Sequence, residues 1–243
     1  MTATPVYEFP LDWYQFASAT FRIQSSSLVS NRPFLRGKNV KGPYAALWVA
    51  EFSLTPQQDP QRQEIAAFFS RLDGQAGLLR IGDPSRLQPW HDRGLTASLE
   101  AWSDSSTWSD GTLWASGYLP PDVYVQAAAA KGDNFIVLGG LPASLSNCFR
   151  RGDLLQLKPN GIPGSSPSLH EIQVGGATNS SGQIGVEIRP RLRQNFVLGD
   201  QATLRNATSV FRLVDDDQGV MSITPPVLGS GGFKLVEALD QVP

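Results

Sequence analysis

Five short runs of alternating apolar and polar residues, separated by turns, fill the segment from residue 150 to residue 213. In the run 170–174, Ile172 and Val174 alternate with polar residues, which is typical of a half-buried β-strand. Pro190 ends the third run, because proline cannot donate a hydrogen bond to a neighbouring strand. The runs are residues 154–157, 170–174, 184–188, 199–204 and 211–214. Strands this short and this closely spaced predict a small antiparallel β-barrel.

The first half of the chain predicts a sheet with one helix. Residues 9–29 and 48–54 alternate as strands, and residues 78–81 form a further short strand. Between the last two, Ile65, Phe69 and Leu72 recur with the spacing of one helix face, together with Phe68. We expect Asp59 to cap this helix with Pro60 at its first position, and Gly74 to end it. A helix between two strands is expected to pack on their sheet.

The layout of the domains has two solutions. Leu119-Pro120-Pro121 is the best linker candidate, and late strands follow the barrel segment at 211–214 and 233–236. A glycine- and proline-rich loop separates these two strands. The residues alone allow either two domains in tandem or a first domain interrupted by the barrel.

The order of these parts resembles the distal tail proteins of long-tailed, siphovirus-type bacteriophages and of gene transfer agents. The resemblance covers roughly residues 45–90 and 130–215, and the stretch 100–118 and the loop 158–168 depart from it. Its motifs are Trp48-Val49-Ala50-Glu51-Phe52-Ser53-Leu54, Leu72-Asp73-Gly74-Gln75-Ala76-Gly77, Gly82-Asp83-Pro84, Gly152-Asp153-Leu154-Leu155-Gln156-Leu157, His170-Glu171-Ile172, Gly182, Arg189-Pro190-Arg191-Leu192-Arg193, Gly199-Asp200 and Phe211-Arg212-Leu213.

The resemblance implies a mainly β protein with a discontinuous first domain. Residues 1–121 and 208–243 would form a ring-forming (belt) β-sandwich with one helix. Residues 122–207 would form an inserted small β-barrel that is OB-like or galectin-like. The function implied is that of a structural virion protein: an adaptor ring, commonly a hexamer, that joins the tail tube to the tail-tip hub or baseplate. Its location would be the virion tail tip, after assembly in the host cytoplasm.

Composition restricts the possible partners. The net charge is −2 and only 17% of residues are charged, which argues against general nucleic-acid binding, although DNA could pass through the lumen of a ring. The low charge is consistent with surface covered by neighbouring subunits. Cys148 is the one cysteine, so no intrachain disulfide can form, and we expect a buried, inert thiol. The sequence predicts neither a secretion signal nor a membrane span.

Residues that could carry chemistry are few. Neither His91 nor His170 has a second ligand at metal-binding spacing, and His170 is expected to be a partly exposed cross-strand residue. The run 215–217 consists of three aspartates and is predicted to be a solvated turn rather than a calcium loop. A glycan hydrolase would need a carboxylate pair that the sequence cannot position. We therefore expect no metal, no cofactor and no enzymatic activity.

A tryptophan repeat is the first candidate binding feature. Trp102, Trp108 and Trp114 recur with period six, which would place all three indoles on one face of an extended strand. Such a row can pack in a core or anchor a subunit interface. Alternatively, it can stack on sugars, which would make the chain a virion carbohydrate-binding module that contacts host surface glycans.

A cationic loop is the second candidate. Arg32, Arg36, Lys38 and Lys41 surround Pro33, Gly37 and Gly42. The loop is either a solvated hairpin tip or a contact with an acidic neighbouring subunit.

Overall fold

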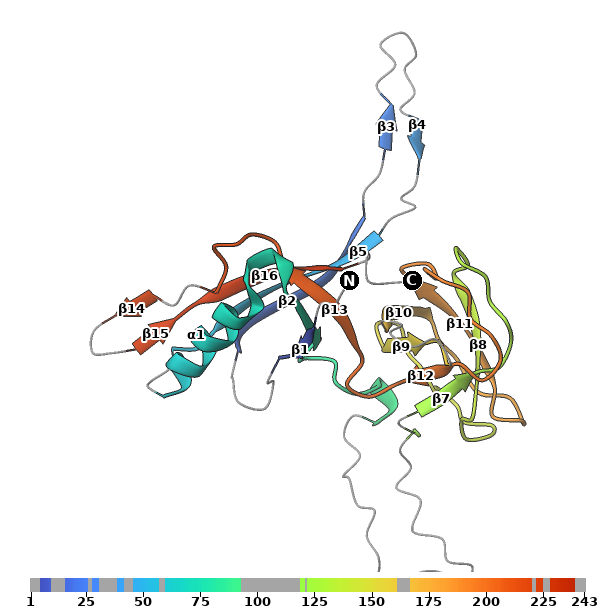
Figure 1. Ribbon diagram of the computed structural model, residues 1–243. Coiled ribbons are helices and arrows are strands. Elements are labelled where there is room, and N and C mark those ends of the chain that lie inside the picture. Colours follow the sequence, from blue (N-terminus) through green and yellow to red (C-terminus); the bar gives the residue numbers. More distant parts are fainter. Residues whose placement is uncertain are drawn as a thin grey trace, which may run out of the picture.

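A computed structural model gives the fold of the chain. It describes residues 5–9, 16–25, 28–30, 39–41, 46–56, 60–92, 119–120, 122–160, 167–219, 222–224 and 228–238. These residues form one sheet with an α-helix, a closed barrel beside it and two small hairpins (Figure 1). The prediction of a mainly β protein with one helix and a small barrel is confirmed.

The sheet has six strands in the order β1-β6-β13-β16-β5-β2. Strand β1 pairs with β6 in parallel, and the other neighbours are antiparallel. The strands are β1 (Val6–Glu8), β2 (Phe16–Ser25), β5 (Ala46–Leu54), β6 (Leu78–Gly82), β13 (Thr208–Leu213) and β16 (Gly232–Glu237). The sheet therefore combines strands from before and after the barrel segment.

One face of the sheet is covered by helix α1 (Gln61–Leu72). Ile65, Phe69 and Leu72 are buried, and the ring of Phe69 lies 5.0 Å from that of Phe233 on β16. Trp48, Ala50, Phe52 and Leu54 are buried at alternate positions of β5, and belong to the same apolar cluster as the helix residues. The predicted helix and its packing on the sheet are confirmed, and Asp59 lies outside the described residues.

The helix ends differently from the prediction. Asp73, rather than Gly74, is the first residue in the left-handed region (φ 56°), and Gly74 follows with φ 66°. Aspartate tolerates this conformation better than most residues do. A Cβ on Gly74 would lie 2.5 Å from Oδ1 of Asp216, the atom that accepts a hydrogen bond from the N–H of Gln75. The backbone conformation at 74 therefore favours glycine, and a larger residue there would also require the exposed Asp216 side chain to shift.

The barrel closes in the order β10-β11-β8-β7-β12-β9, with every pair antiparallel. Four of the five predicted runs are barrel strands, whereas 211–214 overlaps β13, which pairs in the sheet. Two earlier strands, β7 (Asp122–Val125) and β8 (Phe135–Gly139), complete the closure. The others are β9 (Leu154–Lys158), β10 (Ser168–Val174), β11 (Ile184–Arg189) and β12 (Gln201–Thr203).

Two small hairpins stand apart from the sheet and the barrel. Strand β3 (Leu28–Ser30) pairs with β4 (Asn39–Lys41), and β14 (Ser222–Thr224) pairs with β15 (Leu228–Ser230). The first hairpin, which we call the arm, projects away from both the sheet and the barrel (Figure 1). The segment expected to be a loop between the late strands thus contains β14, β15 and the start of β16.

Candidate functional site

The residues singled out in the sequence fall mostly outside the described part of the chain. The structure does not describe Trp102, Trp108 and Trp114, nor does it describe Arg32, Arg36 and Lys38. Lys41 is the last residue of β4, where it pairs with Leu28 of β3. Arg32, Arg36 and Lys38 therefore lie between the two strands of the arm in the sequence, and both the solvated tip and the subunit contact stay predictions. Neither the glycan platform nor the packing role of the tryptophan row is tested, and both stay predictions.

The structure instead brings together residues where the barrel meets the sheet. We call this region the junction, and it consists of Trp48, Leu154, Leu169, Arg193 and Glu237. Leu154 and Leu169 belong to barrel strands β9 and β10, yet they are buried in the apolar cluster of the sheet. Their neighbours Leu155 and Leu157 belong to the core of the barrel. Strands β9 and β10 therefore have two buried faces, one inside the barrel and one against the sheet.

Trp48 is the centre of the apolar part of the junction. Its side chain is fully buried, and its indole Nε1–H donates to the carbonyl oxygen of Leu169 at 2.7 Å. Phe21 of β2 packs on it with 5.1 Å between ring centroids. A tryptophan buried in this way contributes apolar area and at the same time fixes the position of a barrel strand through one hydrogen bond.

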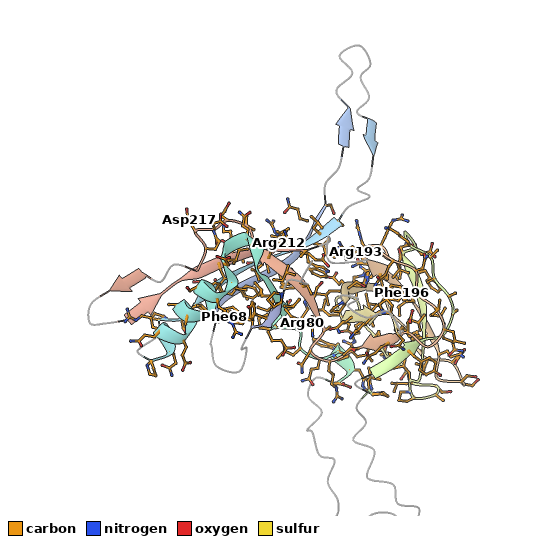
Figure 2. All side chains as sticks on the ribbon, viewed as in Figure 1. Phe68, Arg80, Arg193, Phe196, Arg212 and Asp217 are labelled. Atoms are coloured by element: carbon orange, nitrogen blue, oxygen red, sulfur yellow. The ribbon has the colours of Figure 1, made fainter. Side chains whose placement is uncertain are left out.

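A buried ion pair forms the polar part of the junction. Nη2 of Arg193 lies 2.6 Å from Oε2 of Glu237, and it also donates to the carbonyl oxygen of Ala46 at 2.9 Å. Glu237 accepts two further hydrogen bonds, from the backbone N–H of Trp48 at 3.0 Å and from the hydroxyl of Ser209 at 3.1 Å. Figure 2 shows Arg193 between the barrel and the sheet.

Desolvation dominates the electrostatics of this pair. Burial raises the pKa of Glu237, and the charge of Arg193 and the donated hydrogen bonds offset only part of that effect. The two side chains are 10% and 3% exposed, so removing one partner leaves the other charged, buried and unpaired. The pair thus ties the orientation of the barrel to β16.

His170 differs from its prediction, because it is fully buried rather than partly exposed. It pairs with Leu155 across the β9–β10 ladder and so points into the barrel, where Nδ1 lies 2.8 Å from the carbonyl oxygen of Pro190. A carbonyl only accepts, so Nδ1 carries the proton, and Nε2 accepts from the hydroxyl of Ser168 at 2.9 Å. Burial lowers the pKa of His170 to about 4, with a contribution from nearby Arg193. The imidazole is therefore neutral near pH 7.

A second ion-pair group links the loop after β6 to the outside of the barrel. Arg86 lies 2.6 Å from Asp83 and 3.0 Å from Glu171 of β10, and its guanidinium lies 5.9 Å from the ring centroid of Trp48. Burial alone would lower the pKa of Arg86, but the hydrogen bonds and charges of the two carboxylates raise it above its ordinary value. This group extends the junction from its buried centre to the surface.

A third set of polar contacts holds the chain where it enters the barrel at Leu119. Asp92 is fully buried in η2 (Trp90–Asp92), and Arg205 donates to its Oδ2 from Nη2 at 2.9 Å. Oδ1 of Asp92 accepts the backbone N–H of Leu119, the residue expected to begin the linker. Leu119 is itself buried in the barrel core. The described start of the linker is thus held by the hydrogen bond from Leu119 to Asp92 on one side and by the packing of the Leu119 side chain in the barrel core on the other.

Other groups with possible chemistry are structural. Cys148 is buried as expected, and desolvation raises the pKa of its thiol to about 12. The three aspartates 215–217 are exposed on a turn, in agreement with the prediction. Among the described residues, no group of three or more His, Cys, Asp or Glu side chains could hold a metal ion. The described part of the chain contains no helix that is long and apolar enough to cross a membrane.

Sequence reasoning missed the junction, although two signals for it exist. Glu237 has the same phase as the buried Phe233 and Leu235 on β16, so a carboxylate interrupts an apolar face. The adjacent Leu154 and Leu155 break the alternation of a half-buried strand and so indicate a strand that is covered on both faces. Neither signal names the partner residue. No protein-family model matches the chain, and a search of curated proteins finds no match either.

Proposed function

We propose that the chain is a structural adaptor of a virion tail, which forms a closed ring that joins the tail tube to the tail-tip hub. The resemblance described above suggests this role, and the buried junction is the observation that supports it best. In this proposal the six-stranded sheet is one layer of a sandwich, and the barrel is of the OB-like or galectin-like kind.

The junction gives an adaptor the mechanical property that it needs. A protein that joins two different neighbours must hold two surfaces in a fixed relative orientation. Here a buried ion pair, a buried indole and two leucines fix the barrel on the sheet. A force on one of these parts would then be carried to the other with little rotation between them, because packed interiors deform little.

The arm supports a contact between subunits. Its strands β3 and β4 pair with each other and with no other described strand, and they extend away from the sheet and the barrel (Figure 1). A ring needs a heterologous contact, in which one surface of a subunit binds a different surface of the next. An arm whose connecting segment carries Arg32, Arg36 and Lys38 would reach an acidic surface on the adjacent copy.

Mass measurement of the purified oligomer tests the proposal. We expect a closed homomeric ring, with a hexamer as the favoured number, alone or together with the tube protein. Reversing the charge of the arm (Arg32→Glu with Arg36→Glu) should shift the mass toward the monomer, and Lys131→Glu on the exposed surface of the barrel is the matched control. A monomer at high protein concentration, with and without the tube protein, would contradict the ring. Binding to a glycan array by wild-type protein, lost in a Trp108→Ala variant, would favour the carbohydrate-binding alternative instead.

A further inference from the structure

Strand β2 has an open edge. It is the last strand in the sheet order, and it pairs along its length with β5 and with no other described strand. The register is irregular only between Phe16 and Ser18, so the remaining run to Ser25 is regular. A strand of this length whose second edge pairs with no described strand presents a row of backbone N–H and C=O groups on which a further strand can pair.

A groove of about 660 Å³ runs along this edge. One wall is β2 itself, from Ala19 to Ile23 together with Ser25. The other wall comes from the outside of the barrel and from the loop after β6, and it includes Arg86, Glu171 and Arg189. The edge therefore faces a second wall across the groove, which would contact an added strand from its far side.

The charges in the groove are not balanced. Both carboxylates that line it, those of Asp83 and Glu171, are bound to Arg86 at 2.6 and 3.0 Å. Arg22 on β2 and Arg189 on β11 also line the groove, are exposed, and have no ion pair or side-chain hydrogen bond within the described residues. As far as the described residues extend, two cations thus remain available on opposite walls of one groove, where each would bind a carboxylate through charge-assisted hydrogen bonds.

We propose that this groove binds an acidic, extended segment of another protein, which pairs with β2 as an added strand. Main-chain hydrogen bonds to β2 supply affinity, and carboxylates at alternate positions of the segment bind Arg22 and Arg189. The occupant is specified by charge complementarity together with the open strand edge. The proposal is independent of ring formation and stands if the chain proves to be a monomer.

Peptide binding to the full-length chain tests the proposal. The probe is a fluorescently labelled peptide of alternating glutamate and threonine, about eight residues long so that it matches the regular part of β2. Two control peptides replace glutamate with lysine, or threonine with proline. The proline peptide keeps the carboxylates but loses the N–H groups that strand pairing needs. We expect saturable binding of the glutamate–threonine peptide, and affinity about tenfold weaker or worse for both controls.

Charge reversal on each wall locates the site. Arg22→Glu and Arg189→Glu are both exposed substitutions, and each should weaken binding of the acidic peptide about tenfold or more. Lys131→Glu, on the barrel but outside the groove, should leave binding unchanged. Equal binding of the lysine or the proline peptide, unaltered affinity in both arginine variants, or no saturable binding would each overturn the proposal. If Arg22→Glu abolishes self-association while the peptide does not bind, the groove belongs to a second copy of the chain, which also overturns it.

Discussion

Strands β9 and β10 contribute to both the interior of the barrel and the junction, yet the two regions are stabilised in different ways. The inner face of β9 and β10 contributes Leu155, Leu157 and Ile172 to an apolar core. The outer face contributes Leu154 and Leu169 to the core of the sheet, beside the Arg193–Glu237 ion pair. An apolar core loses stability in proportion to what is removed, whereas a buried ion pair fails when either partner is lost. The barrel should therefore respond gradually to substitution and the junction abruptly.

The largest expected effect lies in the barrel interior. Phe196 is 1% exposed in the barrel core (Figure 2), so Phe196→Ala should lower the free energy of unfolding by about 3–5 kcal/mol. Chemical denaturation of both proteins measures this loss. Phe135→Ala is the control, because that side chain is 53% exposed and should cost much less. Equal losses for the two variants would show that the two rings contribute alike.

The junction is next, and a double-mutant cycle distinguishes it from the core. Arg193→Met should cost about 3 kcal/mol, because it leaves the buried carboxylate of Glu237 without its ion-pair partner. Adding Glu237→Gln to that variant should restore much of the loss, since no unpaired charge remains and the amide oxygen can still accept a hydrogen bond from Trp48 or Ser209. Arg191→Met, at an exposed arginine of the same segment, should change stability by less than about 1 kcal/mol. Strictly additive losses for Arg193 and Glu237 would contradict a coupled pair.

The contrast between the two regions also explains what the sequence could predict. Period-two alternation predicts strands at 170–174 and 184–188, because side chains that face into the barrel recur at every second position. The apolar residues that follow the Gly152-Asp153 turn predict the strand at 154–157. The helix was also predictable from a local pattern, because Ile65, Phe69 and Leu72 recur with the helical period on one face. These patterns are local, so they can be recognised in the sequence without knowing which residues each strand or helix packs against.

The junction could not be predicted in this way, because its partners are distant in the sequence. Trp48 binds a carbonyl 121 residues away, and Arg193 binds a carboxylate 44 residues away. Within 122–207 the adjacent Leu154 and Leu155 indicate a strand that is covered on both faces, but this local signal does not identify the residues that cover it. That residues 122–207 fold by themselves stays a prediction. Deleting this segment should nevertheless destabilise the sheet, because Trp48 and Glu237 would lose their partners Leu169 and Arg193.

Acid should separate the two regions by pH. The pKa of His170 falls from 6.5 to about 4 on burial inside the barrel. The neutral imidazole therefore makes its full contribution to the free energy of unfolding above about pH 6.5, and this contribution is lost as the pH falls toward 4. The loss amounts to about 3 kcal/mol, at about 1.4 kcal/mol for each unit of pKa. Glu237 acts in the opposite direction, because its raised pKa favours the folded state at low pH.

A variant isolates the histidine from this opposing contribution. His170→Gln removes the titrating group and should flatten the dependence of unfolding free energy on pH between about 6.5 and 4. Denaturation midpoints across that range, for both proteins, give the comparison. Parallel pH profiles for wild type and His170→Gln would show that the acid sensitivity arises elsewhere.

The smallest expected effect concerns the indole of Trp48, and it tests whether the junction depends on hydrogen bonding or on packing. Trp48→Phe keeps an aromatic ring in contact with Phe21 but removes the Nε1–H that donates to the carbonyl oxygen of Leu169. A buried carbonyl left without its donor costs about 1–3 kcal/mol, and the smaller ring adds a packing loss. Because the bond joins β5 to β10, hydrogen exchange should become faster in both strands while the β8 amides, on the far side of the barrel, stay protected. A uniform increase in exchange over the whole chain would instead mean that the sheet and the barrel unfold as one cooperative unit, with the indole serving only as core volume.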